Sequence, residues 1–518
     1  MKKHILILTL LVFAFQILFS QQINKDYVRQ KRSADTFYDF NDFKKALEIY
    51  KELFIIAPQS SELNFKIGVC LFYMSNEKTE AIPYFETAAK IDQTDAFYYL
   101  GNLYHLESNF ERALSAYNQY RNQKGEKSFL DQEIDRQIII TRNAIDLVRN
   151  PVNVKIENLG SVINSSNSDY APVISADGTV LIFTSRREGS TGVLLDPYGE
   201  YFEDIYISKK IDDKWTEPKG ISQNINTSGH DASVALSADG EKLFIYRTNQ
   251  SLTGGDLYES TFDGNDWTQP VKLGSDINTE EGWEPSASIS ADSETLYFSS
   301  NRPGGFGGKD IYRVVKLPNG EWSKAVNLGP TVNSSYDDDA PFIHPDGKTL
   351  YFSSKGHNTM GGYDIFKTVK GEQGDWSNPE NLGYPINSIA DDIYFVLNVN
   401  GNEGFYASKK PSGIGKSDIY KVVLPDEDFE LAVLKGSVHN NTDLPLRADI
   451  RLIDEENNTI HGIYLTNILT GKFIMIITPG KTYRMIVEAE GYYPYSDIVG
   501  SHTPLIPLKL TRISNQQN

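Results

Sequence analysis

The chain has 518 residues, of which 40% are hydrophobic and 23% charged, and its formal net charge is −19. This length and composition are typical of a folded protein of three or four domains and exclude a disordered chain. The negative charge disfavours nucleic acid and anionic lipid surfaces as partners, because like charges repel over the range that salt permits. Cys70 is the single cysteine, which excludes an intramolecular disulfide.

The N-terminus has the pattern of a secretory signal peptide over residues 1–20. Two lysines precede an apolar stretch from Ile5 to Phe15, and Ser20 precedes a polar start. An uncleaved anchor is the alternative, but the apolar run is short for a bilayer and Gln16 breaks it. We therefore expect cleavage near Ser20 and export to the periplasm, with no direct membrane span.

Residues 24–149 have helical periodicity and contain three copies of a pattern typical of tetratricopeptide repeats. The small and aromatic positions of the copies are Ala34, Phe37, Ala46, Tyr50 and Pro58, then Gly68, Leu71, Ala81, Phe85 and Ala88, then Leu100, Gly101, Tyr104, Ala113 and Tyr117. Small residues let the two helices of a repeat approach, and aromatic residues fill the space between repeats. Residues 129–149 would be a capping helix. An ordinary helical bundle is the alternative.

The first helices of such repeats line a concave groove. The residues that would face it are Asp35, Tyr38, Phe65, Val69, Phe72, Tyr98, Asn102 and His105. This mixture of aromatic and polar side chains suits a protein or peptide partner, because rigid aromatic anchors carry much of the energy of an interface. Phe65 and Val69 are also candidates for packing within the stack. The sequence predicts that the groove holds the protein at the envelope through a partner.

Residues 151–425 have a different period. The triplets Asp204-Ile205-Tyr206, Asp256-Leu257-Tyr258, Asp310-Ile311-Tyr312, Asp364-Ile365-Phe366 and Asp418-Ile419-Tyr420 recur every 52 to 54 residues, each after a short strand headed by a turn such as "SADG". Repeats of this length made of short strands predict a β-propeller. We count five blades, with six as the alternative. The strand at residues 152–157 would close the ring by completing the last blade, which removes an exposed edge.

The glycine run "NRPGGFGGKDIY" could be mistaken for a phosphate-binding loop. Such a loop needs a Lys-Ser/Thr pair that opens a helix, whereas Lys309 is followed by Asp310. The run lies in one of five equivalent hairpin connections, so we interpret it as structural. Four tryptophans recur 11 or 12 residues after a triplet and would mark outer strands: Trp215, Trp267, Trp322 and Trp376. The remaining tryptophan, Trp283, is outside this series.

Residues 430–512 alternate apolar and polar residues between turn glycines, which predicts a small antiparallel β-sandwich. The fold class is therefore multidomain: an all-α tetratricopeptide stack, an all-β propeller and a small sandwich.

This order of units resembles the PorE-type, OmpA-family envelope proteins of Bacteroidota, which accompany the type IX secretion system. The blade pattern from Leu273 to Trp322 and the stretch from Gly471 to Tyr492 carry the resemblance, with a TolB-like propeller and a carboxypeptidase regulatory-like sandwich as the implied domains. The resemblance implies a scaffold that binds other outer-membrane or periplasmic proteins. Those proteins usually continue into a peptidoglycan-binding domain that this sequence lacks, so we do not expect peptidoglycan binding.

Catalytic motifs are missing from the sequence. The eight histidines, His4, His105, His230, His344, His357, His439, His461 and His502, form no H-E-x-x-H, and we interpret them as surface or loop residues. No G-x-S-x-G elbow occurs. Asp337, Asp338 and Asp339 could bind calcium, but their place in the repeat indicates a blade position. We expect no catalytic, cofactor or metal residues.

Two alternatives to the scaffold stay open. One is an enzyme, because a fold does not determine function. The other is a glycan-binding or glycan-processing propeller, in which aromatic rim residues such as Trp283 and Phe306 would form the platform. Glycosidic chemistry would need a pair of carboxylates at one rim, and the sequence does not establish that geometry.

Overall fold

The computed structural model describes residues 25–74, 78–123, 130–192, 195–196, 199–249, 254–280, 282–425, 431–503 and 506–513. The predicted signal peptide and its cleavage position lie outside these residues. The chain divides into two compact units, Met1–Asp146 and Leu147–Asn518. Over the residues that the structure describes, we find no helix that is both long enough and apolar enough to cross a bilayer.

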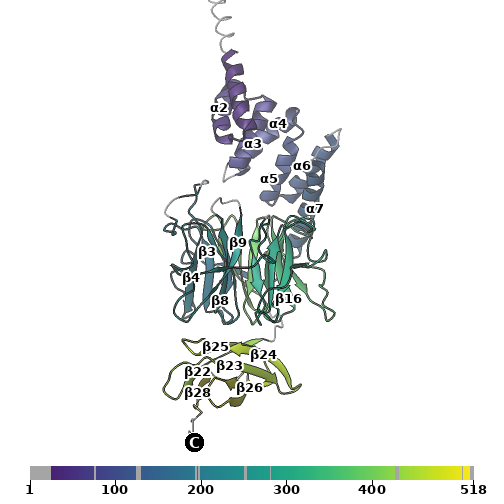
Figure 1. Ribbon diagram of the computed structural model, residues 1–518. Coiled ribbons are helices and arrows are strands. Elements are labelled where there is room, and N and C mark those ends of the chain that lie inside the picture. The colour runs from purple at the N-terminus through teal and green to yellow at the C-terminus, as the bar shows by residue number, and fades with distance from the viewer. Residues whose placement is uncertain are drawn as a thin grey trace, which may run out of the picture. The chain divides into compact units, whose positions relative to one another are not determined.

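The first unit is a stack of helical pairs, as the sequence predicts (Figure 1). A helix over residues 25–39 precedes the elements α2 (Phe43–Ile56), α3 (Ser61–Met74), the 3₁₀ turn η1 (Lys78–Ala81), α4 (Ile82–Ile91), α5 (Ala96–Leu106), α6 (Phe110–Gln123) and α7 (Leu130–Arg149). The 3₁₀ turn η1 directly precedes α4, which has Pro83 near its start. Helix α7 covers the predicted capping helix almost completely.

Glycine and aromatic residues fit one another in this stack. A Cβ on Gly68 would lie 2.8 Å from the Phe85 ring, and a Cβ on Gly101 would lie 2.2 Å from the Tyr117 ring. Both rings are fully buried. Each glycine of the first helix in a pair therefore admits an aromatic ring from the second, which confirms the predicted role of the small positions.

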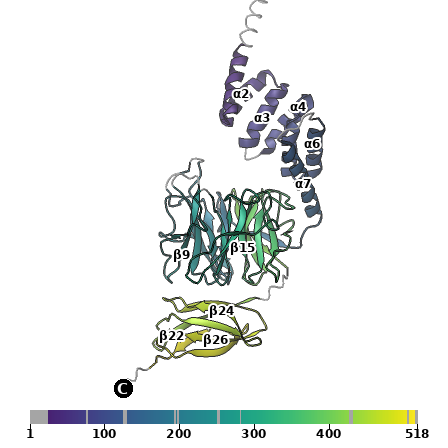
Figure 2. The same cartoon turned by 45° about the vertical axis from the view of Figure 1, so that its right-hand side comes forward.

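The second unit begins with a five-bladed propeller (Figure 2). In chain order the blades are β2 (Asp169–Ile174), β3 (Val180–Ser185), β4 (Asp204–Ile211), β5 (Lys214–Trp215) and β6 (Lys219–Gly220); β7 (Asp231–Leu236), β8 (Lys242–Thr248), β9 (Gly255–Thr261) and β10 (Val271–Lys272); β11 (Ala287–Ile289), β12 (Thr295–Ser300), β13 (Asp310–Val315) and β14 (Val326–Asn327); β15 (Asp338–Ile343), β16 (Thr349–Ser354), β17 (Asp364–Val369) and β18 (Glu380–Asn381); β19 (Asp392–Leu397), β20 (Glu403–Ser408), β21 (Asp418–Val423) and β1 (Lys155–Asn158). The innermost strands β2, β7, β11, β15 and β19 contact one another in a closed cycle.

The ring closes because a strand from its N-terminal end completes the last blade. Strand β1 precedes the first blade in sequence but pairs antiparallel with β21 of the last blade, with Lys155 opposite Val423 and Asn158 opposite Tyr420. This is the predicted closure, although the strand begins at Lys155 rather than at residue 152. Closure leaves the outer edge of the last blade paired like the others.

Neighbouring blades are clamped by one buried asparagine each. Asn387 accepts a hydrogen bond from the backbone N–H of Ile365 (2.7 Å) and donates to its carbonyl (2.8 Å). The equivalent clamps are Asn164 on Ile419, Asn226 on Ile205, Asn278 on Leu257 and Asn333 on Ile311. The apolar residue of each triplet is thereby fixed to the loop that opens the next blade.

The glycine run before β13 is structural, as predicted. Asp310, the first residue of the triplet, accepts hydrogen bonds from the N–H groups of Phe306 (2.6 Å) and Gly307 (3.0 Å). A Cβ on Gly305 would lie 2.5 Å from the Asp310 carboxylate, and a Cβ on Gly307 would lie 1.9 Å from a backbone carbonyl. The glycines are needed because the loop wraps closely around this carboxylate.

Each blade begins with a buried carboxylate, but its cationic partner changes around the ring. In the first three blades Asp169, Asp231 and Glu284 pair with Arg187 (2.9 Å), Arg247 (2.6 Å) and Arg302 (3.4 Å). In the last two, Asp338 lies 3.9 Å from His357 and Asp392 lies 3.9 Å from Lys410. The carboxylates of the fourth and fifth blades are therefore less well neutralised.

The repeated tryptophans lie at the start of the outer edge and pack on the preceding blade. Trp215 contacts Phe405 (ring centroids 6.3 Å apart) and Trp376 contacts Tyr297 (6.1 Å). Trp267 and Trp322 join the apolar clusters of the first and second blades.

A β-sandwich completes the second unit. One sheet has the order β25 (Lys472–Ile477), β22 (Ala432–Asn440), β28 (Ile506–Leu510), and the other has the order β24 (Thr459–Leu465), β23 (Asp449–Asp454), β26 (Thr482–Glu488), β27 (Tyr495–Gly500). Strands β22 and β28 are parallel, whereas the remaining pairs are antiparallel. The sandwich is therefore mixed rather than purely antiparallel as predicted.

Candidate functional site

The residues predicted to face the groove of the helical stack have different environments. Val69 and His105 are 2% and 6% exposed. The His105 ring lies 3.0 Å from the Thr141 hydroxyl on α7, and Val69 belongs to the core. Val69 therefore packs within the stack, the alternative that the sequence left open for it, whereas the prediction for His105 is wrong because this residue is enclosed where it contacts α7.

The other predicted residues are half-buried and make contacts within the stack. Asp35 accepts from Lys66 (2.6 Å), Lys31 (3.0 Å) and the Tyr50 hydroxyl (2.7 Å). Burial acts to raise the pKa of Asp35, but these partners outweigh it and hold the pKa below its usual range. The Asn102 side chain accepts from the Tyr117 hydroxyl (2.7 Å). Both polar residues therefore hold the helices in register.

Aromatic rings dominate this part of the stack. Phe65 packs edge-on against Phe85 and Tyr99, with ring centroids 5.9 and 5.8 Å apart. Tyr38 packs edge-on against Phe43 at 5.6 Å. Phe72 contacts Tyr99 at 5.2 Å, and Tyr98 contacts Tyr99 at the same distance.

The structure adds two rings that the sequence analysis missed. Tyr73 is 58% exposed and stacks on Phe43 at 5.3 Å with an interplanar angle of 11°. Tyr99 stacks on Phe85 at 4.8 Å and 3°. Each follows a predicted position by one residue, so a wider helical face would have included both. We call Tyr38, Phe72, Tyr73, Tyr98 and Tyr99 the aromatic face.

Three hydroxyls of the aromatic face, those of Tyr38, Tyr98 and Tyr99, are neutral. Burial raises the pKa of Tyr38, Tyr98 and Tyr99 above the ordinary value. Rings fixed by stacking lose little conformational freedom on binding, and their neutral hydroxyls remain hydrogen-bond donors. The aromatic face is thus suited to a protein or peptide surface.

The propeller holds the second group of candidate residues. Trp283 is 42% exposed and Phe306 is 49% exposed, so both rim aromatics are accessible. The three aspartates considered for calcium have separate partners: Asp337 pairs with Lys355 (3.0 Å), Asp338 accepts from Ser334 N–H (2.6 Å), and Asp339 pairs with Lys309. Within the described ranges no cluster of three or more His, Cys, Asp or Glu side chains could hold a metal ion.

Three histidines in the described part of the chain are buried: His230 and His344 are in loops, as predicted, whereas His105 is on helix α5, contrary to the prediction. His105, His230 and His344 are 6%, 6% and 0% exposed. His344 replaces the serine of the "SADG" turn and accepts from the Asp346 N–H (3.3 Å), and His230 lies 3.2 Å from Glu203. Turn and loop positions become buried here because neighbouring blades cover them.

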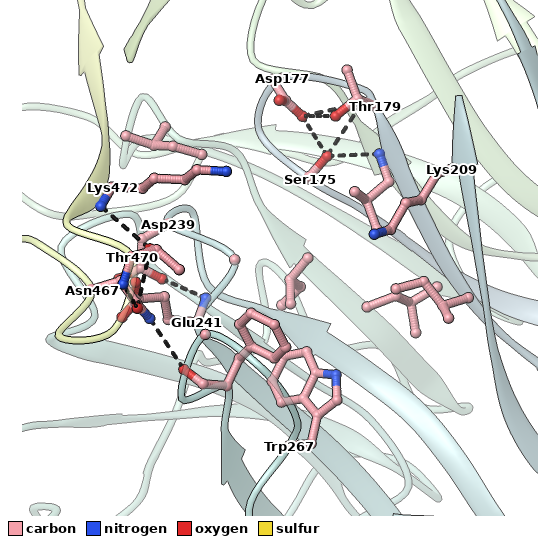
Figure 3. A pocket seen from close by; sticks show the side chains of 18 of the residues that line it. Ser175, Asp177, Thr179, Lys209, Asp239, Glu241, Trp267, Asn467, Thr470 and Lys472 are labelled. Atoms are coloured by element: carbon pink, nitrogen blue, oxygen red, sulfur yellow. Dashed lines mark hydrogen bonds between the residues drawn. The ribbon is translucent and has the colours of Figure 1, made fainter. Parts of the chain in front are cut away.

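A cavity of about 1000 Å³ is lined by the first two blades and by the sandwich (Figure 3). Asp177 in its wall accepts from Ser175 (2.6 Å) and Thr179 (2.7 Å) and pairs with Lys435. Asn467 accepts from the N–H groups of Leu469 and Thr470 (3.0 Å each). These polar groups stabilise turns, so they do not form a catalytic arrangement.

Comparisons with known proteins give no family. No protein-family model matches the chain, and no curated protein sequence does. Among solved structures, the first tetratricopeptide domain of Spaghetti (RPAP3) bound to an HSP90 peptide is similar at 15% identity and TM-score 0.21, over 23% of this chain and 93% of that one.

Two β-propeller structures are also similar. The WD40 repeats of RRP9 are similar at 10% identity and TM-score 0.29, over 53% of this chain and all of that one. The tricorn protease is similar at 14% identity and TM-score 0.31, over 67% of this chain and 28% of that one. The domains of this chain are therefore identified by their own helix spacing and strand pairing.

Proposed function

We propose that the protein is a non-catalytic interaction scaffold of the cell envelope and that the aromatic face of its helical stack binds another envelope protein. The observation that carries the proposal is the array of five half-buried or exposed rings on the first helices of three successive pairs, with Tyr73 58% exposed. Exposed aromatic groups that are held rigidly are what interfaces use as anchors.

The cellular setting of the proposal comes from the sequence. The predicted signal peptide favours export, and the order of domains resembles that of the PorE-type, OmpA-family envelope proteins. We therefore propose a periplasmic protein that is associated with the outer membrane through its partners, as an accessory component of a type IX secretion-like or related assembly.

Site-specific photo-crosslinking in cells tests the proposal. A photoreactive phenylalanine analogue at Tyr73 or Tyr98 should give the same crosslinked envelope protein. The matched control places the analogue at Ile55, which is 82% exposed on α2, the second helix of its pair. The proposal predicts no such product from position 55. Equal crosslinking from positions 55 and 73, or different products from 73 and 98, would contradict it.

A further inference from the structure

The strands and asparagine clamps of the propeller repeat in every blade, but the residue types at three positions near its axis do not. They are the residue before the first-strand carboxylate, the residue after that carboxylate, and the residue before the triplet aspartate. The residues there are Ser168, His230, Trp283, Asp337 and Asp391; Tyr170, Ala232, Pro285, Asp339 and Ile393; and Glu203, Gly255, Lys309, Tyr363 and Ser417. Equivalent positions in a closed ring surround the same axis. Charged and aromatic residues at these positions are not explained by the repeat.

Lys309 forms one side of this group. Its ammonium pairs with Asp339 and lies 5.0 Å from the Trp283 ring centroid and 5.5 Å from that of Tyr363. The Asp339 carboxylate is 2% exposed and also accepts from the Ser299 hydroxyl (2.7 Å). The positive charge of Lys309 is therefore already neutralised within the protein.

Glu203 forms another side. It pairs with Arg186 (2.8 Å), lies 3.2 Å from His230, and accepts from the Tyr170 hydroxyl. Burial acts to raise the pKa of Glu203, but His230, Arg186 and Tyr170 outweigh it and hold the pKa at about 2. Glu203 is thus an ionised carboxylate that shares the Arg186 guanidinium with Asp196 (3.0 Å) and Glu200 (2.6 Å).

Tyr394 of the fifth blade lies between the Lys309–Asp339 pair and Glu203. Its ring is 6.0 Å from that of Tyr170, and the charges of Asp339 and Glu203 both act on its hydroxyl. Its φ is +63°, at a bulge where the first and fourth blades have Ala171 and Ala340. A bulky residue in this region is strained, which is typical of functional positions. Within the described part of the chain its hydroxyl makes no hydrogen bond.

The propeller channel is narrow at Tyr394. A cavity of about 20 Å³ there is lined by this ring and by Ala171, Ser233, Ser286 and Ala340. That space is of the order of one water molecule. A ligand larger than a water molecule would therefore not enter the channel. It would contact these residues from the solvent side, where Trp283 is exposed.

We propose that Tyr170, Glu203, Trp283, Lys309, Asp339, Tyr363 and Tyr394, the axial cluster, bind a neutral carbohydrate. Sugar hydroxyls can donate to the Glu203 carboxylate and accept from the Tyr394 hydroxyl, and the exposed ring of Trp283 can cover an apolar sugar face. A charged ligand fits less well, because it would have to compete with ion pairs that are already formed. This function is separate from partner binding by the helical stack.

Calorimetric titration of the full mature chain tests the proposal, with cellotriose, mannotriose, xylotriose and triacetylchitotriose as probes. At least one should bind, with a Kd that changes less than about twofold between roughly 0.05 and 0.5 M NaCl, since a neutral ligand gains nothing from unscreened charge. Trp283→Ala and Tyr394→Phe should each weaken binding about tenfold or more, which corresponds to about 1.4 kcal/mol.

A matched control is Tyr493→Ala, which removes an aromatic side chain that is 53% exposed in the sandwich and should leave the Kd unchanged. Melting curves for each variant establish that it is folded. The proposal is overturned if none of the four sugars binds, if Trp283→Ala binds as tightly as the parent, or if affinity falls steeply with salt. The last result would indicate a charged ligand instead.

Discussion

The helical stack and the propeller are both built from repeats, yet they join neighbouring repeats by different means. In the stack, the Phe85 ring of one helical pair stacks on the Tyr99 ring of the next pair, with centroids 4.8 Å apart. In the propeller, the amide of Asn387 clamps the backbone of Ile365 across a blade boundary, and β1 closes the ring with β21. Apolar packing holds the first region, and buried polar bonds fix the second.

The comparison also shows which positions of the repeats carry exposed side chains. In both regions the repeated positions are used for packing, and some of the residues that differ between repeats are exposed to solvent. Tyr73 in the stack and Trp283 in the propeller are examples, at 58% and 42% exposure. All five tryptophans lie in the propeller, so tryptophan fluorescence follows that region while helical circular dichroism follows the stack.

The largest expected effect is the loss of a ring from the stack. Tyr117 is fully buried against Gly101, and truncating a buried aromatic side chain costs about 3 to 5 kcal/mol. Tyr117→Ala should lower the melting midpoint of the helical signal and leave the fluorescence midpoint unchanged. Tyr117→Phe, which loses only the bond to Asn102, should cost about 1 kcal/mol. A shared shift of both midpoints would show that the two regions unfold together.

Breaking a blade clamp should give the converse result. Asn387→Ala leaves the buried N–H of Ile365 without its partner, whereas the Ile365 carbonyl still accepts from the Leu382 N–H (3.1 Å), so the expected cost is about 2 kcal/mol. The fluorescence midpoint should fall and the helical midpoint should not. Asn400→Ala, at an exposed turn position of the same blade, is the control and should have little effect. An equal effect of both variants would argue against the clamp.

Three buried carboxylates of the fourth and fifth blades predict that the stability of the propeller depends on pH. Burial raises the pKa of Asp338 to about 7, of Asp364 to about 8 and of Asp392 to about 6, and the nearby Asp392 charge adds to the rise at Asp364. Folded-state pKa values above the unfolded value mean that the folded protein retains protons. The stabilisation of the folded state by these retained protons is complete at low pH and is lost as the pH rises through about 6 to 8.

The fluorescence midpoint should accordingly fall between about pH 5 and pH 8.5, and Asp364→Asn should flatten this fall by an amount on the order of 2 kcal/mol. The helical midpoint of the same samples is the control. A propeller that is equally stable at both pH values, or a variant with the parent's slope, would contradict the charge assignment.

A smaller effect should separate two tryptophans. Trp322 packs on the second blade, whereas Trp283 is 42% exposed. Trp322→Ala should therefore destabilise the propeller by about 2 kcal/mol, less than a fully buried ring, and Trp283→Ala by under about 1 kcal/mol. Urea titration of each variant, followed by far-UV circular dichroism of the β-sheet signal, measures the difference. Equal midpoints would count against the repeat assignment.

The sequence predicted the repeats well because their signals are periodic. The spacing of Ala34, Gly68 and Gly101 reported the helical pairs, and the recurrence of the aspartate triplets reported five blades and the closing strand. Both signals depend on local geometry that every copy must satisfy. They persist even when individual residues diverge, as in the last blade.

Solvent exposure was predicted less well, because it depends on elements distant in sequence. Val69 and His105 satisfy the groove pattern but are buried, and His105 contacts Thr141 on α7. The sequence analysis assigned one residue per helical turn to the groove and therefore missed Tyr73 and Tyr99. The axial cluster joins residues from four blades, so no single stretch of sequence contains it.

Deletion of residues 24–148 tests most directly whether the helical stack is the tether to an envelope partner. The remaining chain contains the propeller and the sandwich, which belong to one compact unit. The account predicts that the deleted protein keeps the parent's fluorescence melting midpoint, and that it is recovered in the soluble periplasmic fraction while the full chain sediments with envelope complexes. A folded deletion variant that sediments as completely as the full chain would contradict the account and move the tether to the propeller or the sandwich.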